Sequence, residues 1–132
     1  MGLTSILVLD DVDAVRSRIL QSLCDLNVDI FLEADSAPSA VQAIAQYRPQ
    51  VAILDIQVPG TDTIRNGMDV LRWAHIHYPE TAVIILSNHN HPQYRKTCVL
   101  LGAVRFFDKS SEFEYLHDSV KALLEMKAAK ST

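Results

Sequence analysis

Five groups capable of chemistry stand at or just after the ends of apolar stretches: Asp10, Asp11, Asp55, Ser87 and Lys109. Asp55 follows the apolar stretch 51–54. Pro59 and Gly60 then end that strand, because proline cannot donate to a ladder and glycine permits the turn. A carboxylate at the tip of an apolar strand has two interpretations. It caps the following loop, or it belongs to the edge of an open α/β sheet at which ligands bind.

Hydrophobic spacing indicates the elements that must position these groups. Apolar stretches predict five strands, at 5–9, 28–32, 51–54, 82–86 and 104–107. Apolar residues recur at helical spacing within 15–26, 37–45, 68–78, 94–101 and 113–123. Ser36 and Pro38 predict the start of the second helix, which must end before Pro49. Strands that are apolar throughout are typical of a sheet covered on both faces, so we predict an α/β fold with a doubly wound, five-stranded parallel sheet and five helices.

Parallel strands bring the groups that follow them to one edge of the sheet. Two carboxylates about 5 Å apart repel by roughly 3 kcal/mol at an effective dielectric of about 20, so three of them on one edge need a cation. Oxygen ligands favour Mg²⁺ over zinc or copper. Asp55 is then the candidate nucleophile, since a carboxylate can attack phosphorus and form an aspartyl phosphate. Ser87 and Lys109 would stabilise the equatorial phosphoryl oxygens.

With these residues in place, the chain resembles the receiver domain of two-component response regulators, such as chemotaxis regulators, over nearly its whole length. The segments that carry the resemblance are Ile6–Asp11, Ile53–Asp55 with Pro59–Gly60, Ile84–Ser87, and Gly102–Ala103 through Phe106–Lys109. The resemblance implies a flavodoxin-like strand order, 2-1-3-4-5. It also implies that Asp55 is the phosphoacceptor and that Mg²⁺ is held by Asp10, Asp11, Asp55 and the backbone carbonyl of Gln57, with Asp11 a direct ligand.

The resemblance further implies a switch and a phosphoryl donor. Ser87 would be the switch hydroxyl, Phe106 the switch aromatic and Lys109 the lysine that pairs with the phosphate. The residues alone favour Phe106 as core packing, and only the family implies that its ring rotates. The donor would be a phosphohistidine on a sensor histidine kinase or a histidine phosphotransfer protein.

Several positions depart from the family pattern without removing a reacting group. Asn88 stands where a small residue usually leaves access to the phosphoryl group, so we expect altered rates of transfer or hydrolysis. The segment between Pro59 and Gly67 is longer than usual, and its Arg65 could reach the site or shield it. Ser110 replaces the proline common after the lysine, which puts the cis peptide bond often found there in question.

The leading hypothesis is a phosphoacceptor signalling module of a two-component system or phosphorelay, with no enzymatic activity beyond its own phosphorylation and dephosphorylation. The alternative is a degenerate receiver that is never phosphorylated and acts only through protein contacts, although the full set of reacting groups argues against it. An aspartyl-phosphate phosphatase is disfavoured because Gln57 stands where such enzymes place an acid. Flavin binding is disfavoured because Asp10 and Asp11 would repel a phosphate after the first strand.

Length, charge and composition restrict the number of domains, the cellular compartment and the kinds of partner that we expect. The 132 residues suit one domain, and we expect a frayed tail from 127 to 132. A net charge of −4 argues against nucleic-acid contact, and neither a membrane span nor a signal peptide is apparent. Cys24 and Cys98 are interpreted as buried thiols in a reducing cytoplasm. Only one helix follows Lys109, so we expect output through an unknown protein partner. The chain would be either a stand-alone receiver or one cut from a larger protein. A homodimer is compatible with either of these alternatives.

Overall fold

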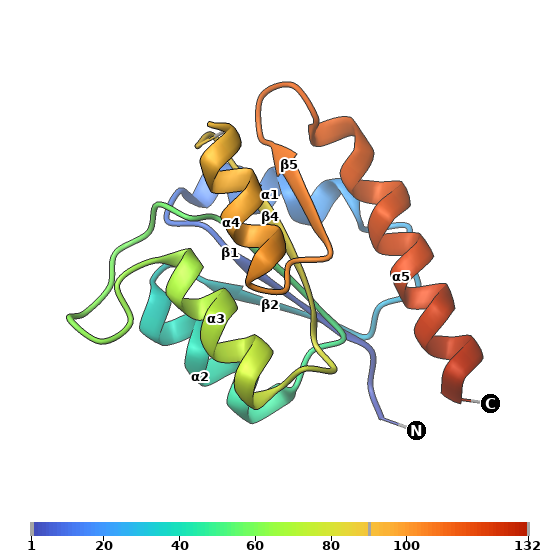
Figure 1. The fold of residues 1–132 in the computed structure, drawn as a ribbon. Coiled ribbons are helices and arrows are strands. Elements are labelled where there is room, and N and C mark those ends of the chain that lie inside the picture. Colours follow the sequence, from blue (N-terminus) through green and yellow to red (C-terminus); the bar gives the residue numbers. More distant parts are fainter. Residues whose placement is uncertain (1, 90, 132) are drawn as a thin grey trace.

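Among the residues that the structure describes, 2–89 and 91–131, five strands form one parallel sheet in the order β2-β1-β3-β4-β5 (Figure 1). The structure is a computed structural model. The strands are β1 (Ser5–Leu9), β2 (Ile30–Ala34), β3 (Val51–Leu54), β4 (Ala82–Ser87) and β5 (Arg105–Asp108). All four neighbouring pairs are parallel. The predicted doubly wound sheet and its strand order are therefore confirmed.

Two strands begin later than the hydrophobic pattern predicts. The pattern places β2 over 28–32, but the strand begins at Ile30, because Val28 closes a turn by donating its amide to the Leu26 carbonyl (2.9 Å). The register then pairs Ser5 with Ile30 along β1. β5 begins at Arg105, one residue later than the start of the predicted stretch 104–107. These shifts change the ends of the strands and leave their order intact.

The helices are α1 (Asp13–Ser22), α2 (Ala37–Tyr47), α3 (Gly67–His77), α4 (Pro92–Leu100) and α5 (Leu116–Ser131), with a 3₁₀ turn at Phe113–Tyr115 before α5. α2 begins as predicted, because Ser36 and Ser39 form a reciprocal capping box and Pro38 lies in the first turn. It ends at Tyr47, ahead of Pro49. None of the helices within the described residues combines the length and hydrophobicity that a membrane crossing requires.

The last helix is longer than the sequence predicts. α5 stays helical to Ser131, whereas the chain from 127 onward is expected to fray, and Thr132 of that expected tail lies outside the described residues. Lys127 donates from Nζ to the carbonyl of Glu80, just before β4. This contact holds the end of α5 beside the sheet. Sequence spacing within the helix cannot reveal such a tertiary contact.

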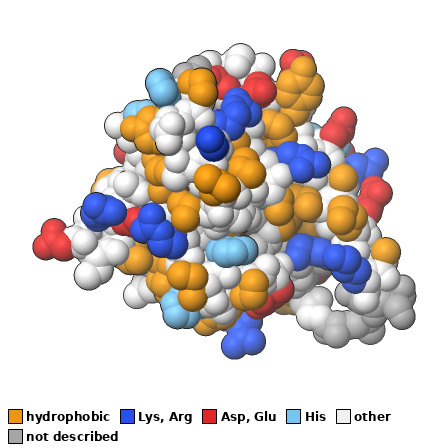
Figure 2. All heavy atoms as spheres, viewed as in Figure 1, with side chains coloured by type: hydrophobic (Ala, Val, Ile, Leu, Met, Phe, Trp, Pro, Cys, Tyr) orange, Lys and Arg blue, Asp and Glu red, His pale blue; other side chains and the backbone are white. Residues whose placement is uncertain are grey.

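Helices cover both faces of the sheet (Figure 1). α2, α3 and α4 pack on one face, against buried strand residues such as Leu7 and Ile85. α1 and α5 pack on the other, against residues such as Ile53. Alternation along β5 sends Phe106 into the first layer and Phe107 into the second. Figure 2 shows the outer surface over α3 and α4, where Lys and Arg side chains lie among hydrophobic ones.

The two cysteines lie in different environments. Cys98 is buried within the layer of α2, α3 and α4, and burial raises the pKa of its thiol to about 11. Cys24 is exposed, so the prediction that both thiols are buried is wrong for this one. It falls in the turn after α1, beyond the apolar face whose spacing suggested burial.

His117 on α5 links that helix to the connection between α1 and β2. Its ring nitrogens lie 2.9 Å from Asp118 and 2.9 Å from Asp25. Both carboxylates raise the pKa of the imidazole above its ordinary value of 6.5. The folded state therefore binds the proton more tightly than the unfolded state does. The resulting stabilisation is complete below pH 6.5 and is lost as the pH rises through the folded-state pKa.

We expect His117→Gln to lower the free energy of unfolding at about pH 5.5 and to have little effect at about pH 8.5. Urea unfolding of both proteins at the two pH values measures the difference. Asp25→Asn removes one of the two carboxylate partners and should give a smaller change of the same sign. An equal loss of stability at both pH values would contradict an ionic role for His117.

Candidate functional site

The carboxyl ends of four strands bring the predicted site residues to one edge of the sheet. Asp10 and Asp11 follow β1, and Asp55 follows β3, where its amide donates to the end of β1 (3.0 Å). Ser87 ends β4, and its carbonyl accepts from the amide of Lys109 (3.0 Å). Residues that are far apart in the sequence therefore meet, as the strand pattern predicts.

Lys109 lies between two carboxylates. Its Nζ donates to Oδ2 of Asp10 (2.6 Å) and to Oδ2 of Asp55 (2.8 Å). The Lys109 side chain is 12% exposed, and both carboxylates are buried. An ammonium enclosed in this way is held in one place. The candidate phosphoacceptor and the candidate phosphate-pairing lysine are thus in direct contact.

Enclosure also shifts the titration of this pair. Burial raises the pKa of Asp55 and the neighbouring Asp10 adds to the rise, while the bond to Lys109 opposes it. Burial by itself would lower the pKa of Lys109, but its bonds to Asp10 and Asp55 outweigh burial and raise it. The lysine is therefore cationic at neutral pH.

Three carboxylates at this edge offer oxygens that lie within 4.8 Å of one another, from Asp10, Asp11 and Asp55. Asp11 is exposed and lines a groove of about 500 Å³ together with Gln57 and His89. One ammonium balances only part of the three negative charges. An all-oxygen donor set with one side open to water is the kind that Mg²⁺ prefers. The residues present therefore fit a hydrated Mg²⁺ ion.

Arg16 on α1 holds the chain at Asp10. Its guanidinium donates to the Asp10 carbonyl (2.7 Å) and to Glu33 (3.0 Å), and it also contacts Asp13. The Asp10 carboxylate accepts from the amide of Val12 (2.9 Å), so it also orders the chain entering α1. Sequence reasoning missed Arg16, because helical spacing shows only that it lies off the apolar face.

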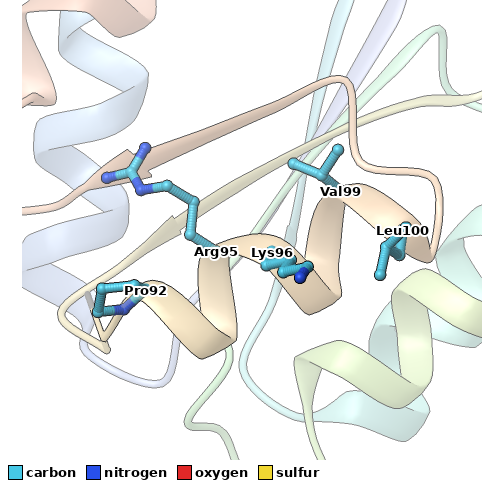
Figure 3. Close-up of a pocket in the computed structure, with 5 residues that line it drawn as sticks. All are labelled: Pro92, Arg95, Lys96, Val99 and Leu100. Carbon is cyan, nitrogen blue, oxygen red and sulfur yellow. The ribbon is translucent and has the colours of Figure 1, made fainter.

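The two candidate switch residues are both buried. The Ser87 hydroxyl accepts from the amide of His89 (3.2 Å). The Phe106 ring lies beneath the guanidinium of Arg95, which extends from α4 with its Cζ 4.8 Å from the ring centroid. Figure 3 shows Arg95 leaving α4. Arg95 is a second residue that sequence reasoning missed, since nothing in its spacing signals a contact with β5.

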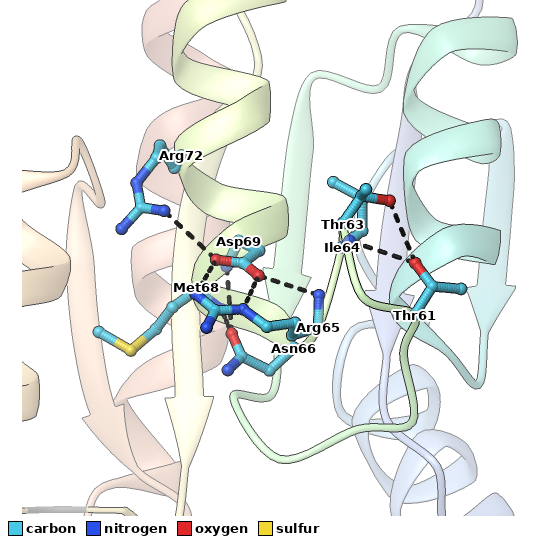
Figure 4. Close-up of polar contacts among 8 residues, drawn as sticks. All are labelled: Thr61, Thr63, Ile64, Arg65, Asn66, Met68, Asp69 and Arg72. Atoms are coloured by element: carbon cyan, nitrogen blue, oxygen red, sulfur yellow. Dashed lines mark hydrogen bonds and ion pairs between the residues drawn. The ribbon is translucent and has the colours of Figure 1, made fainter.

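The connection between β3 and α3 is ordered by its own polar contacts (Figure 4). Arg65 bonds Asp69 rather than Asp55. Its Nε donates to Oδ2 of Asp69 (3.0 Å), and Arg72 donates to the other oxygen (3.3 Å). The bond from Arg65 holds the pKa of the buried Asp69 carboxyl below its usual range. The longer loop therefore turns its arginine toward α3.

Ser110 closes the turn after β5 in a way that proline could not. Its amide donates to Oδ1 of Asp108 (2.9 Å), and its hydroxyl donates to the same oxygen (2.7 Å). The described residues contain no cis peptide bond. Lys109 is thus positioned by a side-chain turn at Asp108, because Ser110 offers the amide hydrogen that proline lacks.

Gly67 allows α3 to begin directly against the site. A Cβ at this position would lie 1.9 Å from the carbonyl oxygen of Asp55, and the Gly67 amide donates to the Ile56 carbonyl (2.9 Å).

We expect Gly67→Ala to lower the free energy of unfolding by roughly 3 kcal/mol and to displace Asp55, because backbone atoms must move. Urea unfolding and amide chemical shifts measure the two effects. Gly2→Ala is the matched control, since nothing lies within 4 Å of its Cβ. Unchanged shifts at Asp55 would contradict the steric reason.

Fold and sequence together define the class of this protein. The chain matches the family model of the response regulator receiver domain over residues 6–121, and it belongs to that family. The resemblance stated from the sequence is therefore confirmed.

Individual relatives match most of this chain, and a solved structure shares its fold. The Fimbriae Z protein of Salmonella typhimurium is 26% identical over 121 residues, which cover 91% of this chain and 56% of that protein. A protein-glutamate methylesterase/protein-glutamine glutaminase of Haloarcula marismortui is 31% identical over 129 residues, covering 92% of this chain and 34% of that protein. A response regulator receiver domain protein from Methanospirillum hungatei shares the fold with a TM-score of 0.84 at 22% identity, covering 98% of this chain and 99% of that one. The chain thus spans about half, or less, of the length of the two curated relatives.

Proposed function

We propose that this receiver domain is a phosphoacceptor module of a two-component system or phosphorelay and that Asp55 is the residue phosphorylated. The observation that carries the proposal is the Lys109 ammonium, which lies 2.8 Å from Asp55 and 2.6 Å from Asp10 at the edge where three carboxylates converge. A degenerate receiver, the alternative, has no need of this arrangement. Burying two carboxylates around one ammonium has a cost in desolvation free energy. A degenerate receiver would gain no function that offsets this cost.

The chemistry would proceed from a phosphohistidine of a sensor histidine kinase or a histidine phosphotransfer protein. A carboxylate oxygen of Asp55 attacks phosphorus, the P–N bond to the imidazole breaks, and the imidazole leaves with the bonding electrons. Lys109 faces the charge on the phosphoryl oxygens, and the Ser87 hydroxyl is a second partner for them. Water then attacks the phosphorus of the aspartyl phosphate, the P–O bond to Asp55 breaks, and inorganic phosphate leaves as the carboxylate is restored. The chain would then catalyse its own phosphorylation and dephosphorylation and no other reaction.

A divalent cation belongs to this proposal. Asp10, Asp11 and Asp55, with the backbone carbonyl of Gln57, would hold Mg²⁺. The ion would supply positive charge that offsets the negative charge of the phosphoryl group and of the carboxylates. Asp11 is the exposed member of the set, so its carboxylate is accessible to a hydrated ion that arrives from solvent.

Output would follow from a shift between two arrangements of Ser87 and Phe106, one of which the phosphorylated Asp55 favours. We propose that this output is a contact with a protein partner in the cytoplasm, with neither nucleic acid nor membrane touched by this chain. The net charge of −4 supports that choice over a nucleic-acid surface. Pairing with a second copy would be one form of such a contact.

The direct test is incubation with Mg²⁺ and acetyl phosphate, followed by measurement of the intact mass. We expect an increment of one phosphoryl group that hydroxylamine removes, because that nucleophile cleaves acyl phosphates, and that EDTA prevents. Asp11→Asn should slow labelling by at least about tenfold at limiting Mg²⁺. Asp62→Asn, a change to an exposed acid outside the carboxylate cluster, should leave the rate unchanged. A wild-type chain that gains no labile phosphoryl group would refute the proposal in favour of the degenerate receiver.

A further inference from the structure

One guanidinium joins three parts of the chain beside the phosphorylation edge, by which we mean the edge of the sheet that carries Asp10, Asp55, Ser87 and Lys109. Arg95, near the start of α4, places its Cζ 4.8 Å from the centroid of the Phe106 ring. Its Nη1 donates to the carbonyl of Phe106 (2.8 Å), and its Nη2 donates to Oε1 of Glu112 (2.7 Å). The same side chain therefore contacts the ring of the candidate switch residue, the backbone of β5 and the connection between β5 and α5.

Glu112 extends this contact toward Lys109. Its Oε1 also accepts from the amide of Asp108 (2.8 Å), and Asp108 immediately precedes the lysine that bonds Asp55. A continuous path of bonds thus runs from Arg95 through Glu112 to the residue next to Lys109. A displacement of the Asp108 backbone would alter its bond to Glu112, and a displacement of the Phe106 ring would alter its contact with Arg95.

The other end of this path is the outer surface of α4. Arg95 lines a shallow groove with Pro92, Lys96, Val99 and Leu100 (Figure 3). The Arg95 side chain is 41% exposed, and Leu100 is 76% exposed. Figure 3 shows the Arg95 guanidinium turned away from Val99 and Leu100, toward β5. Arg95 is therefore accessible from outside while it holds buried groups.

We infer that Arg95 is a positioning residue that couples the state of the phosphorylation edge to the outer surface of α4. This inference rests on the proposed function of Asp55. The physical reason is that a planar guanidinium can stack on a ring and donate in two directions at once, so its position responds to both Phe106 and Glu112. Coupling of this kind is reciprocal, so a ligand that binds α4 and displaces Arg95 would also alter phosphorylation at Asp55.

The test uses beryllofluoride with Mg²⁺ as a phosphoryl mimic and amide chemical shifts as the readout. In the wild-type chain we expect shifts at Ser87 and Lys109, and also at Val99 and Leu100 on α4. Arg95→Met keeps an apolar side chain of similar length over the Phe106 ring but removes the charge and the hydrogen bonds. We expect it to retain the shifts at the edge and to reduce those on α4 by about fivefold or more.

Two further variants make the result specific. Lys96→Met removes a neighbouring positive charge from the same groove without touching Phe106 or Glu112, so it should behave as the wild type. Glu112→Gln leaves Arg95 itself intact but weakens its ionic bond, so it should reduce the α4 shifts in part. Glu112→Gln also serves as the test if Arg95→Met does not fold.

Each remaining outcome overturns the inference. Full α4 shifts in Arg95→Met and Glu112→Gln would show that Arg95 carries no coupling. The same conclusion follows if the wild-type edge responds while α4 does not. Loss of the edge shifts in Arg95→Met would assign Arg95 a structural role in the site itself. If the wild-type edge does not respond to beryllofluoride, the proposed function fails as well, which distinguishes that failure from the failure of coupling alone.

Discussion

Replacing Asp55 by asparagine is expected to abolish labelling by acetyl phosphate, with no residual slow reaction. The amide oxygen of asparagine is a poor nucleophile, and an acyl phosphate cannot form on it. The change keeps the size of the side chain and removes one of three crowded negative charges, so the edge of the sheet should remain folded. Intact-mass measurement after incubation with Mg²⁺ and acetyl phosphate gives the result directly.

The matched control is Asp62→Asn, which changes an exposed acid in the connection that follows Asp55 in the chain. It should be labelled at the wild-type rate. Far-ultraviolet circular dichroism and urea unfolding confirm that both variants are folded. Labelling that persists in Asp55→Asn would show that another group, with Asp10 and Asp11 the nearest candidates, accepts the phosphoryl group.

Replacing Lys109 by methionine is expected to have two large effects. Labelling of Asp55 should slow by about 100-fold, because a charge that stabilises the transferring phosphoryl oxygens is removed. The free energy of unfolding should fall by about 3 kcal/mol, because the change leaves two buried carboxylates without their cation. The first effect is measured by a time course of intact mass, and the second by urea unfolding at neutral pH.

A second substitution separates these two effects. Adding Asp10→Asn to Lys109→Met removes one of the two uncompensated charges, so it should restore part of the stability and none of the labelling rate. Lys121→Met changes an exposed lysine on α5 and should alter neither quantity. Unchanged stability in Lys109→Met would contradict the enclosure of the ammonium by Asp10 and Asp55.

The strand pattern was sufficient to predict the edge at which these residues meet. Asp10, Asp55 and Ser87 each come at the end of an apolar stretch, and parallel strands must deliver their ends to one side. Of the two strands whose starts the pattern misplaced, β2 is shifted by a turn at Val28 that depends on one backbone bond. Hydrophobic periodicity predicts which residues are buried, but it does not predict where a turn closes.

Contacts made by long polar side chains could not be predicted. Arg65 was a candidate to reach Asp55, yet it bonds Asp69, which lies four residues later in the first turn of α3. Arg16 and Arg95 hold the backbone of Asp10 and the ring of Phe106 from two different helices. A flexible side chain takes whichever partner the fold places within reach, and helical spacing contains no information about a partner that lies on another element.

The sequence by itself determined the sheet, the family and the types of group that gather at its edge, because each strand carries its own burial pattern and four of the five lead to a functional residue. Only the tertiary structure decided that Lys109 bonds Asp10 as well as Asp55, that Asp11 alone of the three carboxylates is exposed, and that Arg95 stacks on Phe106. These features depend on distances between side chains from different elements. Such distances are set by how helices and strands pack together, and no local stretch of sequence contains them.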